Sequence, residues 1–449
     1  MKRFFWFVIV VAALLPVSFF SASGKNGILL FCIAGIVLLL GAFVYTRFAR
    51  SELGECDFSI RVLILMVAAG LVMRLFLADG DNFFPTDIGC FAGWSSQAYG
   101  EGLDRFYTSG QFVDYPPLYV YVMYVLGAVK NALPELSYAF LVKIPAILCD
   151  IVLGIWIYRT ARRKTTSGWA LFLAGLILLN PAVCINSAMW GQIDVIYTLM
   201  IALVLYLLVL EKLAGAVILF IFAVLLKPQA LLIAPVGLFY LIDMLCCHKK
   251  RRTAIVQLSV GAGVGICLAY LALLPFADGR SPGWIVDLYQ NSLSTYPYLS
   301  VNGFNLYALL GLNWQPINEY TGLVSVLSAG AVCAVGAYAY FKKRDRTQIF
   351  FCAAWIILGI YLFSHGMHER YTFAVPVLLL LSFVFTRQKS HLWLALMMFA
   401  SNLLMHGIVL WHQTAYIQNG IMMSVSIFNM VIFARMVYDV FRRESSVCK

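Results

Sequence analysis

Long apolar stretches separated by short polar ones recur along the whole chain. Fourteen of them are apolar enough, at about 20 residues each, to cross the roughly 30 Å hydrocarbon core of a bilayer as helices. Their expected bounds are 4–20, 27–46, 62–78, 138–158, 168–185, 194–210, 213–226, 229–246, 253–275, 320–341, 348–364, 371–386, 391–410 and 419–438. The pattern predicts an all-α, polytopic integral membrane protein with about fourteen transmembrane helices.

The first apolar stretch allows a second interpretation. Residues 1–20 begin MKR, run apolar and are followed by the small residues Ser21, Ala22 and Ser23, which is also typical of a cleaved signal peptide. The next apolar stretch, 27–46, follows at once. We therefore expect residues 1–20 to form an uncleaved first span.

Basic residues lie in short clusters between apolar stretches, at 159–164, 249–252, 342–346 and 387–389. The positive-inside rule places such clusters in the cytoplasm. If residues 116–133 crossed the membrane, the first two clusters would face outward. We therefore expect 116–133 to form an interfacial or re-entrant helix in the first large outer loop.

This topology assigns a side to every loop. We expect both chain termini in the cytoplasm. The segments expected to face the outer side are 79–115, 186–192, 276–320 and 364–371. The stretch 276–320 is too polar to span and too apolar to be disordered, so we expect interfacial helices and loops there.

Composition narrows the class of protein further. Hydrophobic residues make up 62% of the 449 residues and charged residues 12%, with a net charge of +11. Since the basic residues lie in the loops between apolar stretches, the positive charge indicates the orientation of the chain in the membrane. No nucleic acid partner is expected. The eleven cysteines contain no C-x-x-C pair, so neither a zinc site nor a disulfide framework is indicated. Short loops and this use of cysteine favour a bacterial plasma membrane.

Candidate chemistry gathers in the outer segment 79–115, which holds Asp79, Asp81, Asp87, Glu101, Asp104 and Asp114. A carboxylate beside an acceptor hydroxyl can take its proton. Asp87 is the preferred base because it opens a helical run; an N-cap role for it is an equal alternative. Asp79 and Asp81 flank a glycine and are weak metal candidates. A divalent metal is doubtful, and no other cofactor is expected.

Several charges fall inside apolar stretches, where a functional role or an internal partner is expected. Arg74 lies one turn from the outer interface, so we expect it to snorkel to the surface. Lys143 and Asp150 are either paired structurally across neighbouring helices or serve the site separately, and we prefer the structural role.

Four short motifs open toward the outer side. They read VDYPPLYVY (113–121), NSAMWGQIDV (186–195), LLKPQALL (225–232) and HGMHERYTF (365–373). Taken in order, they resemble the lipid-carrier-dependent glycosyltransferases of the GT-C class. The chain is most similar to the dolichyl-phosphate-glucose glucosyltransferases and to bacterial Gpi-type mannosyltransferase-like membrane proteins, over about residues 62–375.

The resemblance implies roles for individual residues. Asp87, followed by Trp94, matches the catalytic base of that class. The substrate-binding residues that it implies are Asp114, Tyr115, Gln192, Lys227, Gln229, His368, Glu369 and Arg370. Of these, Lys227, His368 and Arg370 are the cations suited to a donor phosphate. For Gln192 and Gln229, hydrogen bonding between helices is the role that we prefer over substrate binding. For the HERY element, the alternative is a loop cap with a contact between Glu369 and Arg370.

The chain also departs from that class. The eukaryotic enzymes carry a His-rich stretch where this chain has Met189, Trp190, Gly191 and Gln192. The sugar and the acceptor are therefore not transferable from the resemblance.

These observations predict three regions. Residues 1–61 form an N-terminal transmembrane hairpin, 62–375 a GT-C-type catalytic membrane module, and 376–449 variable C-terminal transmembrane helices. The expected activity is inverting transfer of one hexose from a polyprenyl phosphate sugar to an acceptor glycan or lipid at the outer membrane face. The expected partners are that donor, the acceptor and membrane lipid. A transporter or flippase of lipid-linked saccharides, and a non-catalytic sugar-lipid-binding scaffold, stay open as alternatives.

Overall fold

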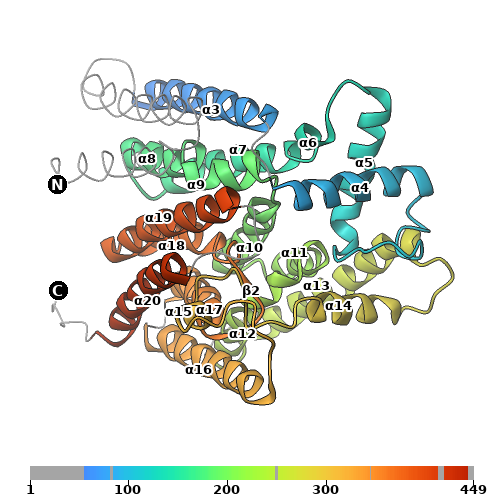
Figure 1. Ribbon diagram of the computed structural model, residues 1–449. Coiled ribbons are helices and arrows are strands. Elements are labelled where there is room, and N and C mark those ends of the chain that lie inside the picture. Colours follow the sequence, from blue (N-terminus) through green and yellow to red (C-terminus); the bar gives the residue numbers. More distant parts are fainter. Residues whose placement is uncertain (1–54, 81–83, 248–250, 344, 413–418, 443–449) are drawn as a thin grey trace. The chain divides into compact units, whose positions relative to one another are not determined.

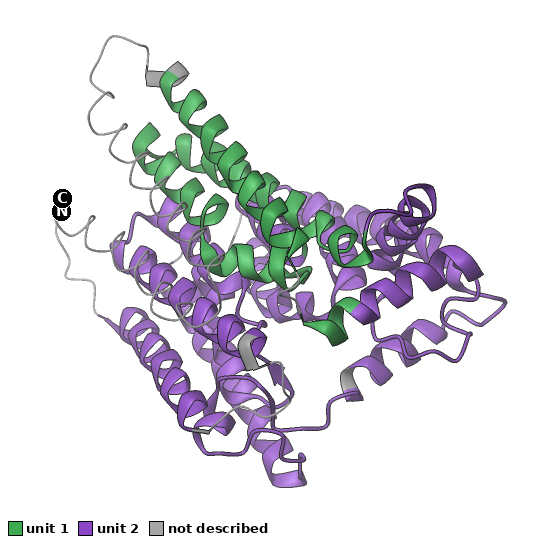
Figure 2. Cartoon of the chain, turned by 45° about the horizontal axis from the view of Figure 1, so that its top comes forward, with its two compact units in different colours: residues 1–88, 137–196 green, residues 89–136, 197–449 purple. Residues whose placement is uncertain are grey.

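A computed structural model describes residues 55–80, 84–247, 251–343, 345–412 and 419–442. The chain divides into two compact units (Figure 2). Unit 1 comprises residues 1–88 and 137–196, and unit 2 comprises residues 89–136 and 197–449. Nearly all regular structure is helical (Figure 1), as the sequence predicts.

The described part of unit 1 consists of helices and one π-turn. They are α3 (Glu55–Asp79), the first residues of α4 (Pro85–Glu101), α6 (Tyr138–Leu141), α7 (Ile144–Arg162), α8 (Ser167–Leu178), α9 (Pro181–Cys184), η1 (Ile185–Met189) and the start of α10 (Asp194–Val209). Helix α8 packs against both α3 and α7. Pro145 and Pro181 stand in the first turns of α7 and α9, where no amide donor is needed.

Unit 2 holds the remaining elements. They are the rest of α4 and α10, then α5 (Pro117–Ala132), α11 (Leu213–Leu226), η2 (Pro228–Ile233), α12 (Ala234–Cys247), α13 (Arg251–Leu273), η3 (Leu274–Phe276), α14 (Trp284–Ser294), β1 (Ser300–Val301), α15 (Leu306–Leu309), α16 (Glu319–Lys343), η4 (Arg346–Gln348), α17 (Ile349–Phe363), β2 (Met367–His368), α18 (Ala374–Thr386), α19 (Lys389–His412) and α20 (Asn419–Phe441). Helix α17 is buried along almost its whole length, packed by α12, α16, α18 and α20.

Within the described residues, nine helices are long and apolar enough to cross a membrane, and α10, α11 and α18 are shorter apolar helices. All twelve coincide with predicted spans. The other two predicted spans, 4–20 and 27–46, lie outside the described residues, so the count of fourteen stays a prediction. Helix α5 covers the predicted interfacial segment and, within the described part of the chain, is not among the nine.

The stretch 276–320 contains two helices, α14 and α15, and one short strand, β1. The strand was not predicted. It pairs in parallel with β2, with Ser300 opposite Met367 and Val301 opposite His368. This pairing anchors the segment that follows α17.

Candidate active site

Asp87 of unit 1 accepts two hydrogen bonds on one carboxylate oxygen. Trp190 Nε1 lies 2.8 Å from Oδ2, and Gln192 Nε2 lies 2.5 Å from the same atom. The Asp87 side chain is half-buried, whereas Trp190 and Gln192 are buried. Because α4 begins at Pro85, Asp87 lies inside the first turn of the helix. The N-cap interpretation of Asp87 is therefore wrong.

A helix break places these two donors. Pro181 has no N–H and so cannot bond the carbonyl of Ile177, and the Ala182 N–H is taken by the Asn180 side chain at 2.9 Å. Helix α8 therefore ends with two carbonyls that lack a helical partner. Arg74 on α3 supplies both partners, donating to Leu178 O at 2.5 Å and to Ile177 O at 3.0 Å.

Arg74 also forms a buried ion pair. Its Nε lies 2.7 Å from Oδ2 of Asp150 on α7, and both side chains are fully buried. The same carboxylate oxygen accepts a short hydrogen bond from Ser187 Oγ. Arg74 thus holds α3, α7, α8 and η1 together. The expectation that Arg74 snorkels to the surface is wrong. The expected pairing of Lys143 with Asp150 across neighbouring helices is also wrong, since Lys143 directly precedes the helix that carries Asp150. The ionic partner of Asp150 is Arg74, which fits the structural role expected of Asp150.

Beyond the break, the backbone forms a π-turn. The Trp190 N–H bonds Ile185 O at 2.9 Å, and the Gln192 N–H bonds Asn186 O at 2.9 Å. Gly191 has a φ of +79°, which favours glycine, and a Cβ there would lie only 2.8 Å from Ile88 Cδ1. Such π-turns are frequent at functional sites. This one points two side-chain donors at one acid.

Two further polar groups support the segment. Lys143 is fully buried and donates from Nζ to Ala78 O at 2.9 Å, which fixes the end of α3 to the start of α7. Asn186 Nδ2 donates to Asp194 Oδ2 at 3.0 Å, which joins the π-turn to the start of α10. The Asp87 carboxylate is therefore approached by a rigid, fully packed segment.

The predicted phosphate-binding residues lie in unit 2. Lys227 follows α11 with an extended backbone and is only 6% exposed. His368 is the last residue of β2, and Glu369 and Arg370 follow it in the segment that leads to α18. Arg370 Nη1 lies 3.0 Å from Glu369 Oε1, the internal contact that the loop-cap alternative expected. That contact does not exclude a second role.

The charges of Lys227 and Arg370 affect the protonation of His368. Burial, together with the positive charges of Arg370 and Lys227, lowers the pKa of His368 well below its usual value. At neutral pH its imidazole is therefore neutral, and the positive charge of this cluster comes from Lys227 and Arg370. An anion bound here would oppose the contribution of the two cations to the lowered pKa of His368.

Strand pairing and aromatic contacts fix this segment. The Gly366 N–H donates to Tyr298 O at 2.9 Å, and the ring of Tyr296 meets that of His368 edge-on at 4.8 Å between centroids. Gly303 packs so closely that a Cβ there would lie 2.5 Å from Met367 O. Sequence reasoning missed segment 296–303 as a partner of the HERY element; its aromatic and glycine content was the available signal.

Asp114, Tyr115 and Gln229 also lie in unit 2. The Asp114 carbonyl accepts from Ser292 Oγ at 3.0 Å. Tyr115 packs in an aromatic cluster with Phe91, Trp94 and Tyr119, at ring distances of 5.2, 5.5 and 5.7 Å. Trp94, expected to follow the base, donates to Phe112 O at 2.8 Å. Among the described residues, no hydrogen bond donor reaches the buried Oε1 of Gln229, whose backbone carbonyl accepts from Tyr197.

Comparison with known proteins supplies the class of this chain. The sequence model of glycosyltransferase family 87 matches residues 112–364, more than half of the chain. This protein belongs to glycosyltransferase family 87. The family is a GT-C-like membrane family, which confirms the predicted membrane glycosyltransferase at that level. No curated protein matches the chain.

The family 87 match covers only part of the candidate residues. Residues 112–364 include Asp114, Tyr115, Gln192, Lys227 and Gln229. Asp87 precedes this region and the HERY element follows it, so their assignment depends on the geometry and on the resemblance of the motifs.

Metal candidates in this glycosyltransferase are few. Asp79 is exposed at the end of α3, and Asp81 lies outside the described residues. In the described part of the chain, no three His, Cys, Asp or Glu side chains are grouped closely enough to hold a metal ion.

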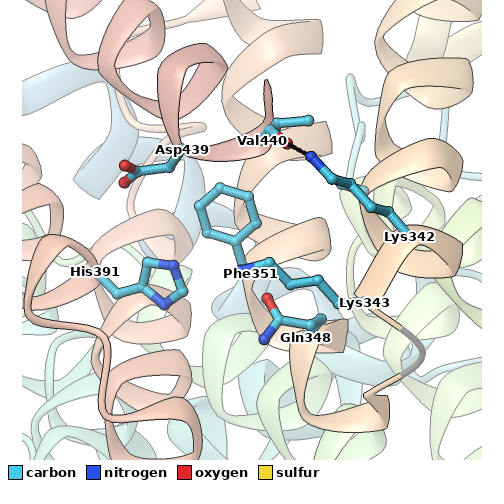
Figure 3. A pocket seen from close by; sticks show the side chains of 8 residues that line it. Lys342, Lys343, Gln348, Phe351, His391, Asp439 and Val440 are labelled. Atoms are coloured by element: carbon cyan, nitrogen blue, oxygen red, sulfur yellow. Dashed lines mark hydrogen bonds between the residues drawn. The ribbon is translucent and has the colours of Figure 1, made fainter. Parts of the chain in front are cut away.

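Two cavities lie in unit 2 of the enzyme. One, of about 200 Å³, is lined by apolar residues of α10, α11, η2 and α12. The other, of about 10 Å³, is lined by residues of α16, η4, α17, α19 and α20 and is too small for a sugar (Figure 3). Beside it, Lys342 Nζ donates to Val440 O at 3.0 Å, which joins α16 to α20. Of these two cavities, the larger has room for part of a substrate.

Proposed function

We propose that this family 87 glycosyltransferase transfers a single hexose from a polyprenyl phosphate sugar to an acceptor glycan or lipid. The reaction takes place at the outer face of the plasma membrane, with inversion at the anomeric carbon. This chemistry is similar to that of the dolichyl-phosphate-glucose glucosyltransferases and of the Gpi-type mannosyltransferase-like proteins. The observation that carries the proposal is the Asp87 carboxylate, bound on one oxygen by Trp190 and Gln192.

Asp87 acts as the general base. Both of its donors bind Oδ2, and among the described residues none donates to Oδ1. The second oxygen of this half-buried carboxylate can therefore accept the proton of an acceptor hydroxyl. The hydroxyl oxygen forms a bond to the anomeric carbon from the face opposite the phosphate. The bond from that carbon to the phosphate oxygen breaks, and polyprenyl phosphate leaves with the electron pair.

Lys227, His368 and Arg370 hold the donor phosphate. Two buried or half-buried cations beside a neutral imidazole suit an anion that gains charge as it leaves. Arg370 can offer two parallel N–H donors to phosphate oxygens, and Lys227 offers a point charge. Asp114, Tyr115, Gln229 and Glu369 orient the donor or the acceptor.

The helix directions within each unit support an outward position of the site. In unit 1, Lys143 and the end of α3 lie at the start of α7, and the basic cluster 159–164 lies at its other end. The 19 residues of α7 span about 28 Å. In unit 2, α17 begins after Arg346 and ends just before the HERY element. The positive-inside rule puts the basic ends in the cytoplasm.

The 200 Å³ apolar groove suits the isoprenoid tail. Helix α11 contributes Ala216, Val217 and Phe220 to the groove and ends at Lys227. One helix therefore offers apolar contacts for a tail and a cation for its phosphate. A nucleotide sugar, which has no tail, would not need this groove.

Transfer assays with the reconstituted enzyme test the proposal. Wild type and Asp87→Asn are placed in vesicles with radiolabelled polyprenyl phosphate mannose or glucose and a membrane extract that supplies acceptors. Wild type should form a labelled product of inverted anomeric configuration. Asp87→Asn should lose about 10²- to 10⁴-fold in turnover, the usual contribution of a general base.

Asp104→Asn is the matched control, because Asp104 is an exposed carboxylate of the same predicted loop. It should leave turnover unchanged. Retention of more than about a tenth of wild-type turnover by Asp87→Asn would move the base to Asp114. Transfer from nucleotide sugars but from no polyprenyl phosphate sugar would overturn the donor class.

A further inference from the structure

The two donors on Asp87 differ chemically but act on the same atom. The Trp190 indole N–H can only donate, so its bond to Oδ2 has one possible direction. Gln192 donates an amide N–H to that oxygen. Two donors on one oxygen leave the carboxylate with a single preferred rotation, and they distinguish its two oxygens from each other.

Both donors are held independently of Asp87. Trp190 is 1% exposed and packs on Phe84, with 5.7 Å between ring centroids. Gln192 is 2% exposed. Their backbones are fixed by the π-turn and by Gly191, whose positive φ turns the chain between them. Because these two donors are already held in place, they need little reorganisation when the reaction takes place.

We propose that Trp190 and Gln192 are positioning residues that bind Oδ2 of Asp87 and so present Oδ1 to the acceptor hydroxyl. They touch neither the donor sugar nor the phosphate; they act through Asp87. This inference rests on the proposed function, since it requires Asp87 to be the base. Displacement of a catalytic base by about 1 Å can lower the rate of the reaction about 100-fold.

The variants separate positioning from packing. Trp190→Phe keeps an aromatic ring against Phe84 and removes the N–H together with part of the ring system, a loss of packing that the control Trp355→Phe shares. Gln192→Ala removes the amide. Each should lower kcat about 10- to 100-fold, with KM for the polyprenyl phosphate sugar and binding of the donor close to wild type. Gln192→Asn, which keeps an amide on a shorter side chain, should recover part of the rate.

Matched controls come from unit 2. Trp355 Nε1 donates to Val332 O at 2.8 Å. Gln97 Nε2 donates to Phe106 O at 2.9 Å and to Ser109 Oγ at 2.6 Å. Both side chains are buried, as the donors on Asp87 are. Trp355→Phe and Gln97→Ala should lower thermal stability and leave kcat close to wild type. They show what the loss of such a hydrogen bond does when its acceptor is not Asp87.

A double-variant cycle gives the decisive measurement. If a residue acts only through Asp87, replacing it should cause no further loss of turnover in an enzyme that already lacks the base. Adding Gln192→Ala or Trp190→Phe to Asp87→Asn should therefore leave the residual turnover unchanged. A further drop of the same size as in the wild-type background would show a merely structural role and overturn the inference. The inference would also be overturned if Trp190→Phe and Gln192→Ala had the same kcat as their controls while Asp87→Asn was inactive. An active Asp87→Asn would instead overturn the base assignment itself.

Discussion

The Nε atom of Arg74 lies 2.7 Å from Oδ2 of Asp150, and neither side chain is exposed. Arg74 also donates to Leu178 O and Ile177 O at the end of α8. One guanidinium therefore neutralises a buried carboxylate and completes the hydrogen bonding of a helix that Pro181 interrupts. Buried pairs of this kind are costly to break, because removal of one partner leaves the other charge without compensation.

We expect Asp150→Leu to lower the free energy of unfolding by about 3–5 kcal/mol. The double variant Arg74→Met with Asp150→Leu should lose less than the sum of the two single variants, since neither charge is left alone. Unfolding in mixed detergent micelles measures both quantities. Arg435→Ala is the control: its pair with Asp439 is an i,i+4 pair in which Arg435 is 43% exposed, so the cost should be about 0.5 kcal/mol or less. Equal losses at both pairs would contradict the structural role of Arg74.

Lys227 and Arg370 should matter for the donor. Replacement of either by Ala should weaken binding of a polyprenyl phosphate by at least about 10-fold, because each removes a charge-assisted contact worth about 1.5–3 kcal/mol. Arg370→Lys should recover only part of the affinity, since it loses the two-donor geometry. Binding is measured by fluorescence with a labelled lipid. Lys342→Ala, in the cluster of Figure 3, is the control and should bind as wild type does. Wild-type affinity in Lys227→Ala, Arg370→Ala and Arg370→Lys would exclude this phosphate site.

His368 should make stability depend on pH. Its pKa is lowered well below 6.5 in the folded protein by burial, Arg370 and Lys227. Below pH 6.5 the unfolded chain therefore takes up a proton that the folded protein does not, and acid favours unfolding. Between pH 6.5 and 5, the free energy of unfolding of His368→Gln should fall by up to about 2 kcal/mol less than that of wild type. Thermal unfolding of both proteins across this range measures the effect; parallel curves would show that His368 does not contribute.

The spans were predictable because apolar length is a local property. The predicted stretch 213–226 has the bounds of α11, and the predicted break before residues 116–117 coincides with the start of α5. Membrane-spanning length and proline position are both visible in a short window of sequence. The stretch 276–320 was also expected to hold helices and loops that do not span, and it contains the short helices α14 and α15.

The partners of the polar residues were not predictable in the same way. Arg74 lies near the end of an apolar stretch, which suggested the interface, and its true acceptors are about a hundred residues further along the chain. The link between Asp87 and Trp190 depends on a π-turn that no local pattern predicts. The parallel pairing of β1 with β2 joins two segments of two residues each, too short to leave a period-2 pattern.

The π-turn has a consequence for the number of residues in segment 181–192. An α-helix advances about 100° per residue, so removal of one residue between Pro181 and Met189 would rotate everything that follows by roughly that angle. Trp190 and Gln192 would then face away from Asp87, although every side chain of the constellation was still present. In this segment the chain length itself is a determinant of the site. A single deletion there should be as harmful as loss of both donors, while an exposed loop such as 108–111 should tolerate one.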